Sequence, residues 1–157
     1  MKKLLKGILL GALMLTLVAC GNNNGSAEDI KVDLGALMEE IVTNNFAEAA
    51  FIDYDDEYLS NMMELDLELV ETYVGKYPMI SMVATEIGMF EAKDGNIEAV
   101  TTAVEGYKEI KKANAWYPAE TENAENSIVL VKGNYVFFIM CENPADIQTQ
   151  IEAAFTK

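Results

Sequence analysis

The sequence predicts an α+β fold in which helices pack on a small three-stranded antiparallel sheet. Two apolar runs rich in β-branched residues flank a Lys-Gly-Asn turn, and a third β-rich run lies upstream of them. Apolar residues recur at helical spacing before, between and after these runs. Residues 30–157 have the length of one ordinary domain, so we expect a single α+β domain there.

The first helix is expected to begin after Asp33, a residue type that caps helix N-termini, and to reach about Asn45. Residues 46–65 show no clear period. Asp66 is a second capping residue, and we expect a short helix after it that ends at Gly75. The apolar stripes of these two helices are Leu34, Leu37, Met38, Ile41 and Val42, and then Leu67, Val70 and Val74.

The middle of the chain predicts a strand over 79–91 and then a helix capped by Asn96. Glu98 near the start and basic residues near the end suit the helix dipole. Pro118 and an acidic loop after it are expected to end this element. The inward face of the helix is Ile97, Val100, Val104, Tyr107 and Ile110.

Two further strands are expected over 127–131 and 135–141, joined as a hairpin, with a last helix starting at Asn143-Pro144. The run 135–141 is apolar on both faces, which is typical of a strand covered on both sides. The intervening helix makes the first two strands parallel, and the hairpin reverses the third. We therefore expect a split β-α-β sheet with strand order first–third–second.

The N-terminal segment has the features of a secretory signal over residues 1–19. Lys2, Lys3 and Lys6 precede an uncharged run that ends at Ala19. That run is shorter than the roughly 17–25 apolar residues that a membrane-spanning helix needs. A short helix that stays attached to the membrane is the alternative interpretation.

Cys20 closes the segment Leu17-Val18-Ala19-Cys20, which resembles the bacterial lipobox, the motif whose thiol is acylated before the leader is cleaved. Residues 20–29 lack large apolar side chains and are expected to be the lipidated Cys and a flexible tether. We therefore expect the protein to be anchored at the outer, extracytoplasmic face of the cell membrane through lipid on Cys20.

Composition restricts the partners and the chemistry. The net charge of −15 disfavours nucleic acid, because phosphate backbones repel an acidic surface. The chain has no histidine and no arginine, which removes the usual general base and the bidentate clamp for phosphate. Cys141 is expected to be a small buried hydrophobe. We expect no cofactor and no catalytic residue.

One acidic segment partly matches an EF-hand calcium loop. Counted from Asp53, the oxygen-bearing positions are Asp53, Asp55, Glu57, Asn61 and Glu64. The glycine that the sharp turn needs is replaced by Tyr58, and Ser60 stands where an apolar residue is usual. A solvated acidic loop is therefore the preferred interpretation, and metal binding is the alternative.

Two other groups of residues are candidate sites. Glu86 and Glu91 would form a carboxylate pair, but their odd separation on one strand places them on opposite faces of the sheet. Trp116 and Tyr117 either form an exposed contact patch or pack under the acidic loop, and packing is the preferred interpretation.

Three stretches, 63–66, 84–95 and 132–139, resemble the bacterial lipoprotein family labelled domain of unknown function 4358. The resemblance implies no activity or substrate. We expect a non-catalytic module that binds an unknown envelope protein or small ligand. The alternatives are an envelope enzyme that uses carboxylates alone and an assembly lipoprotein that dimerises through an uncovered sheet face.

Overall fold

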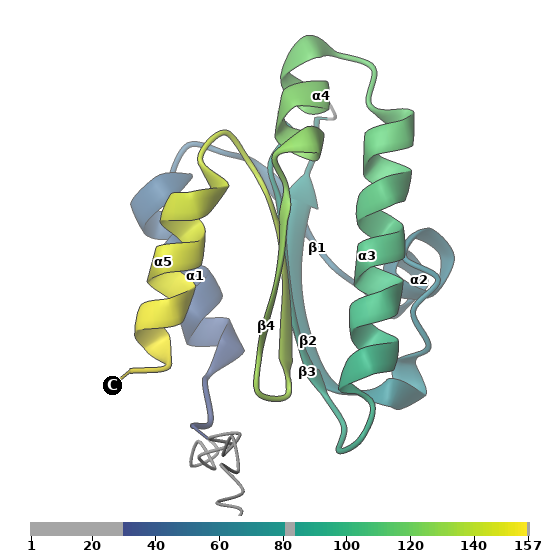
Figure 1. Ribbon diagram of the computed structural model, residues 1–157. Helices are drawn as coiled ribbons and strands as arrows, with labels where there is room; N and C mark the ends of the chain where they lie inside the picture. Colours follow the sequence, from purple (N-terminus) through teal and green to yellow (C-terminus); the bar gives the residue numbers. More distant parts are fainter. Residues whose placement is uncertain (1–29, 81–83, 157) are drawn as a thin grey trace, which may run out of the picture.

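The fold is built on one five-stranded antiparallel sheet with helices on both faces (Figure 1). The computed structural model describes residues 30–80 and 84–156. The strand order is β1-β2-β3-β5-β4, and every neighbouring pair is antiparallel. The strands are β1 (Phe51–Asp53), β2 (Val70–Pro78), β3 (Glu86–Ala92), β4 (Ile128–Lys132) and β5 (Tyr135–Met140).

The expectation of a three-stranded sheet is wrong, although the fold is α+β overall. Strand β5 does lie between β3 and β4, but β3 is internal because β2 pairs with its other edge. The strand expected over 79–91 begins only at Glu86, and Met79 and Ile80 are exposed.

The expected helix from Asp66 to Gly75 is also wrong. Asp66 does cap a helical turn, but this is a single 3-10 turn, η1 (Leu67–Leu69), and β2 starts directly after it. Gly75 lies within β2, where a Cβ atom would stand 1.9 Å from the Tyr54 ring. The glycine therefore lets an aromatic ring lie against the strand and does not end a helix.

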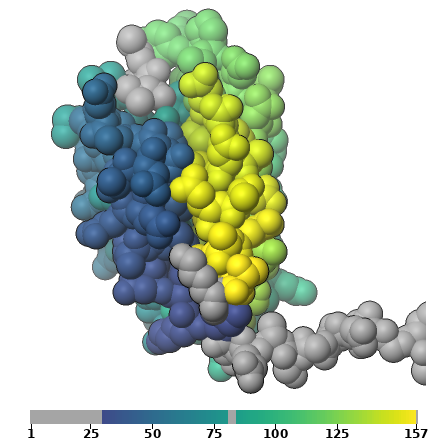
Figure 2. Space-filling model, turned by 90° about the vertical axis from the view of Figure 1, so that its left-hand side faces the viewer, coloured from purple at the N-terminus to yellow at the C-terminus, as the bar shows by residue number. Residues whose placement is uncertain are grey.

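One face of the sheet is covered by two helices that lie side by side, α1 (Leu34–Asn45) and α5 (Pro144–Ala154) (Figures 1 and 2). The side chain of Asp33 caps α1 as expected, accepting a hydrogen bond from Ala36 N at 3.0 Å. The buried cluster on this face includes Leu37, Met38, Ile41, Ile87, Met89, Phe137, Ile139, Ile147 and Ile151.

The opposite face is covered by α2 (Asp56–Met62), α3 (Ile97–Asn114) and α4 (Pro118–Glu125) (Figure 1). Helix α4 corrects the expectation of an acidic loop after Pro118. That helix has no apolar stripe, and its buried residues are Asn123 and Ala124. The core on this face includes Leu59, Phe90, Val100, Val104, Tyr107, Phe138 and Met140.

The two ends of the domain differ. Helix α1 begins at the end where α5 finishes, so both ends of the described chain lie there (Figure 1). The last turn of α1, the start of β3, helix α4 and the start of α5 lie at the other end, which we call the apical end (Figure 1). Within the described residues, none of the helices has the length and apolar character needed to cross a bilayer.

Candidate functional site

Glu86, the first residue of β3, is fully buried and accepts hydrogen bonds from three tyrosines. The hydroxyls of Tyr54 and Tyr107 each donate to Oε1 at 2.7 Å, and that of Tyr58 donates at 3.1 Å. The Tyr58 and Tyr107 hydroxyls are also 2.6 Å apart. These residues and Lys111 form what we call the tyrosine–glutamate cluster.

Lys111 supplies the countercharge. Its Nζ lies 2.8 Å from Glu86 Oε2 and 5.7 Å from the centre of the Tyr107 ring. In the described part of the chain, Oε2 accepts no hydrogen bond from any other side chain. A buried carboxylate without such a partner would be strongly destabilising, so the ammonium allows the charge to remain inside the fold.

Several elements position the tyrosines. Asp55 caps α2 and accepts from Tyr58 N at 2.7 Å, which fixes the first turn of that helix. The ring of Tyr58 then stacks between those of Tyr54 and Tyr77, with ring centres 5.0 Å and 4.3 Å away. Offset stacking of this kind adds to the free energy of burial. The aromatic rings thus hold two hydroxyls at the carboxylate.

The tyrosines act as donors at neutral pH. Burial first, and then the negative charge of Glu86, raises the pKa of Tyr54, Tyr58 and Tyr107 well above the usual value of a phenol. Glu86 Oε1 therefore faces protonated hydroxyls, and Oε2 faces an ammonium group. With both oxygens engaged, the cluster is suited to holding β3 against α2 and α3.

A small cavity of about 130 Å³ lies beside the cluster, lined by residues that include Tyr58, Tyr77, Lys111 and Glu120. Glu120 is already engaged, because its Oε2 accepts from Trp116 N at 3.0 Å. The cavity is smaller than the roughly 300–1,000 Å³ of typical small-molecule sites. It contains both a cationic and an anionic side chain, so its charge is balanced.

The apical end carries a larger concavity of about 560 Å³, which we call the apical hollow. Among the described residues that line it, the charged ones are three carboxylates, Glu122, Glu142 and Asp146, and none is basic. The other lining residues are Asn45, Phe46, Thr85, Ala119, Asn123, Cys141, Asn143 and Ile147. These residues come from the end of α1, the residue before β3, helix α4, the connection before α5 and α5 itself, so the hollow exists only in the folded domain.

Asn123 and Thr85 are buried polar residues that line this hollow, with exposed fractions of 9% and 7%. Asn123 makes a hydrogen bond from its side chain. Its Nδ2 donates to the Ala84 carbonyl oxygen at 2.9 Å. Ala84 has a left-handed backbone (φ 50°), a strained conformation for a residue with a Cβ. The Asn123 hydrogen bond therefore supports the strained entry into β3.

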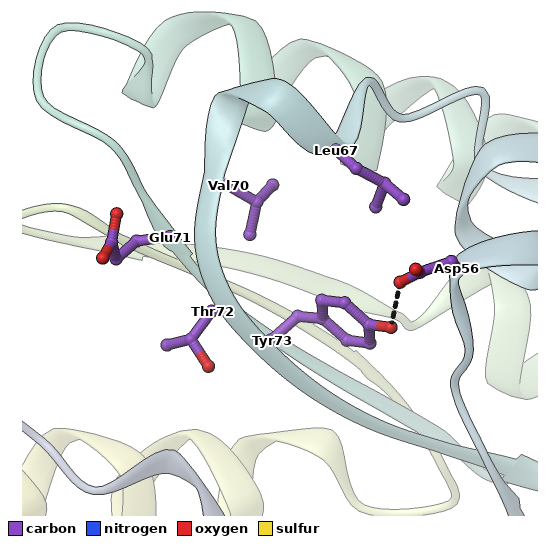
Figure 3. A pocket seen from close by; sticks show the side chains of 6 residues that line it. All are labelled: Asp56, Leu67, Val70, Glu71, Thr72 and Tyr73. Atoms are coloured by element: carbon purple, nitrogen blue, oxygen red, sulfur yellow. Dashed lines mark hydrogen bonds between the residues drawn. The ribbon is translucent and has the colours of Figure 1, made fainter.

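A third concavity, of about 300 Å³, lies where a bulge interrupts the pairing of β2 with β3. Figure 3 shows Tyr73 reaching toward Asp56, while Glu71 points away from them. The Tyr73 hydroxyl donates to Asp56 Oδ1 at 2.7 Å, and burial with this bond raises the pKa of Tyr73 to about 12. The Tyr73 hydroxyl and the Asp56 carboxylate at this site are thus already hydrogen-bonded to each other.

The structure separates the residues of the EF-hand-like pattern. Asp53 lies on β1 and pairs with Lys76, whereas Asp55 and Glu57 lie at the start of α2. Glu64 follows that helix. Across residues 30–80 and 84–156, no three His, Cys, Asp or Glu side chains come together as a metal site requires. A helix therefore occupies the stretch that would have to form the calcium loop.

The structure also places the remaining candidate residues from the sequence. The side chains of β3 alternate between the two cores, so Glu86 and Glu91 face opposite sides of the sheet, as expected. Cys141 is buried, and burial raises the pKa of its thiol to about 11. The expectation that Trp116 packs inward is wrong, because its exposed fraction is 85%. Cys20, with residues 1–29, lies outside the described residues.

Sequence reasoning missed the tyrosine–glutamate cluster. Its members Tyr54, Tyr58 and Tyr107 are 32, 28 and 21 positions from Glu86. One local signal was present, because Tyr107 and Lys111 are four residues apart on α3 and share a helix face. That spacing indicates a Tyr–Lys pair but not the carboxylate that it meets.

The structure is a small α+β domain. Its buried carboxylate, Glu86, has both oxygens bound by neighbouring side chains. Residues 48–141 match the family described as Domain of unknown function (DUF4358), and the chain belongs to that family. The match runs from just before β1 to the end of β5 and includes the whole tyrosine–glutamate cluster. No curated protein and no solved structure matches the chain.

Proposed function

We propose that this protein is a lipid-anchored, extracytoplasmic binding protein, held by lipid on Cys20, whose ligand occupies the apical hollow. The observation that carries the proposal is the position of the hollow relative to the chain ends. The residues that line the hollow belong to elements that meet at the apical end, whereas the described chain enters α1 at the opposite end (Figure 1).

The anchor follows from the leader-like residues 1–19 and the lipobox-like residues before Cys20. A tether over residues 20–29 would reach about 30 Å at most, at roughly 3.3–3.6 Å per residue. It would join the domain at the end where α1 begins, leaving the apical hollow facing away from the bilayer. A ligand from outside the membrane then has direct access.

Binding is favoured over catalysis because the buried carboxylate, Glu86, is already bound by three tyrosines and Lys111. A carboxyl group becomes a general acid near neutral pH when burial or a neighbouring charge raises its pKa. Among the described residues Glu86 is the one buried acid, and both of its oxygens are engaged. It also faces α3, whereas the apical hollow adjoins Cys141 and Ile147 of the other core.

An enzyme that uses carboxylates alone is the second candidate, because Glu122, Glu142 and Asp146 line one concavity. All three are exposed, which leaves them solvated and poorly suited to general-acid chemistry. Turnover of an envelope substrate that is lost on Glu122→Gln would favour the enzyme. Dimerisation through a bare sheet face is disfavoured, because helices cover both faces of the described sheet (Figure 1).

The anchor is tested by expressing the full chain in bacteria fed a clickable fatty acid, with Cys20→Ser as the variant and Cys141→Ser as the matched control. We expect the parent and Cys141→Ser to carry label and sediment with membranes, and Cys20→Ser to do neither. An unlabelled parent, or a Cys20→Ser protein still fully in membranes, would refute the anchor. Protease added to intact spheroplasts should degrade the parent if the domain lies outside.

A further inference from the structure

We propose that the open edge of β4 pairs with the same strand of a second copy of this chain. The pairing is antiparallel and centred on Leu130, so that two five-stranded sheets join into one. The proposal goes beyond the proposed function, because it concerns neither the anchor nor the apical hollow. It also differs from dimerisation through a sheet face, since helices cover both faces of the described sheet.

The outer edge of β4 is open. This strand is the last of the sheet, and among the described residues no other strand pairs with its outer side. Figure 1 views the sheet from this edge, with β4 in front and with α5 and α3 to either side of it. The strand is apolar apart from Lys132, and Val131 is 43% exposed. An uncovered apolar edge is a template for another strand.

The opposite edge of the sheet lacks this property. Strand β1 has only three residues and ends at Asp53, whose side chain is 76% exposed and pairs with Lys76. A short strand and a charged side chain are devices that prevent edge-to-edge association. Strand β4 is longer, pairs with β5 without a bulge and has its one charge at its end. The two edges of the sheet are therefore not equivalent.

The ladder shows which backbone groups of β4 point outward. Ala92 N donates to the Asn134 carbonyl oxygen, so Asn134 and every second residue after it bond to β3. The residues between them bond to β4, where Leu130 is one of their partners. Backbone groups alternate between the two sides of a strand. The N–H and C=O groups of Val129 and Val131 therefore point to the open edge.

Strand β4 is complementary to itself. When two copies are antiparallel about Leu130, Val129 of each copy lies opposite Val131 of the other, and their outward groups exchange hydrogen bonds. Leu130 then lies opposite its own counterpart, so that aliphatic side chains meet across the pair. Such a twofold contact uses the same surface on both copies and closes after two chains. It also covers Val131, which is exposed in the single domain.

The charge distribution favours a second copy at this edge. The chain has a net charge of −15, which opposes association through its acidic surfaces. Residues 126–141, which include β4 and β5, contain no aspartate or glutamate, and their one charge is Lys132. In the antiparallel register Lys132 lies opposite Ile128 of the other copy, so the two lysines do not face each other. Pairing through β4 therefore avoids like-charge repulsion at the contact.

This pairing is compatible with the proposed site. Of the described residues that line the apical hollow, none belongs to β4, so both hollows stay open. The twofold axis reverses the strand, and the chain entries of the two copies therefore lie at opposite ends of the pair. A tether over residues 20–29 would reach about 30 Å at most, which lets both copies attach to one bilayer with their strands along its surface.

The test is light scattering of the full-length protein in excess nonionic detergent, across a range of concentrations. Val131→Pro removes the outward N–H without removing a bond to β5, and the matched control Val131→Thr keeps both the N–H and the β-branch. We expect the parent and Val131→Thr to have two chains per particle at micromolar concentration. Val131→Pro should associate about a hundredfold more weakly, because each copy loses one donor.

Cysteine cross-linking tests the register. Residues directly opposite each other in a non-hydrogen-bonded pair have Cα atoms about 4.5 Å apart, which is within the range of a disulfide. Leu130→Cys should therefore oxidise to a covalent dimer. Val131→Cys should not, because this position lies opposite Val129 and not opposite its own counterpart.

Three outcomes would overturn the proposal. A monomeric parent would refute the second copy and leave the edge to a segment of another protein. A Val131→Pro protein as dimeric as the parent would place the interface elsewhere, and equal cross-linking of the two cysteine variants would contradict the register. Circular dichroism shows whether Val131→Pro is folded, and if it is not, the cysteine variants decide. Fatty-acid labelling of Cys20 reports separately on the anchor.

Discussion

Lys111 Nζ and Glu86 Oε2 lie 2.8 Å apart, and this ion pair ties the last turns of α3 to the first residue of β3. Glu86 is fully buried, whereas the side chain of Lys111 is 22% exposed. The lysine thus reaches from the surface to neutralise a charge in the core. This relationship makes the stability of the whole domain depend on one carboxylate.

Removing that carboxylate should be costly. Glu86→Ala leaves three hydroxyls and an ammonium group without their acceptor, and we expect the free energy of unfolding to fall by about 3–5 kcal/mol. Urea denaturation followed by circular dichroism measures the loss. Glu105→Gln, an exposed change, should stay within about 0.5 kcal/mol of the parent. A Glu86→Ala protein as stable as the parent would contradict a structural role for the cluster.

Gly75→Ala should destabilise the protein because its Cβ would lie 1.9 Å from Tyr54 Cδ2, a distance that forces the ring or the strand to move. We expect a loss of about 3 kcal/mol, at the upper end of overpacking effects. Gly106→Ala is the control, since nothing lies within 4 Å of its Cβ position on α3. Helix propensity predicts that Gly106→Ala stabilises the fold by up to about 1 kcal/mol. Equal effects of the two changes would disprove the contact.

The stability of the fold should fall at alkaline pH. Phenols in the unfolded chain have a pKa of about 10. The folded domain raises the pKa of Tyr73 to about 12 and also raises the pKa values of the cluster tyrosines. A raised phenol pKa contributes stability that is complete below pH 10 and is lost as the pH rises through the folded value. Urea midpoints measured across this range should therefore decrease.

Absorbance of tyrosinate offers a second measurement of the same effect. The chain has seven tyrosines, and Tyr54, Tyr58 and Tyr107 should ionise only when the domain opens. Tyr107→Phe should reduce the cooperative part of the titration by one phenol. A smooth titration of all seven tyrosines without unfolding would contradict the buried hydroxyls.

Cys141 should be chemically inert in the folded protein. Burial raises the pKa of its thiol to about 11, and the side chain is only 1% exposed. In a Cys20→Ser variant, where Cys141 is the remaining thiol, a thiol reagent should react slowly at about pH 8 and rapidly after addition of urea. Equal rates in both conditions would indicate an accessible thiol.

The helices with clear apolar stripes were predictable, and the edge of the sheet was not. The capped start of α1, most of the inward face of α3 and the hairpin of β4 and β5 follow from spacing and turn residues, and the structure confirms them. The expectation that Ile110 faces inward is wrong, because its exposed fraction is 37%. Strand β2 was mistaken for a helix because Leu67, Val70 and Val74 match a helical period. A strand is normally recognised by alternating apolar and polar residues. In β2 this alternation is lost, because the strand has a bulge and packs against a core on each face.

The candidate sites were harder to predict for a physical reason. Glu86 and Glu91 could be assigned to opposite faces from their spacing alone. The partners of Glu86 come from the segment that contains β1 and α2 and from α3, which are far away in the sequence. The apical hollow likewise brings together side chains from five parts of the chain. Helix α4 was missed because it buries Asn123 and Ala124, which leave no hydrophobic pattern in the sequence. Such contacts exist only after the topology is known.

The exposed position of Trp116 has an optical consequence. It is the only indole in the chain, and 85% of its surface already meets water in the native state. Its emission should therefore shift little when the domain denatures. A water-soluble quencher should reach it equally well before and after denaturation, so its fluorescence reports on the α3–α4 connection and not on the integrity of the core.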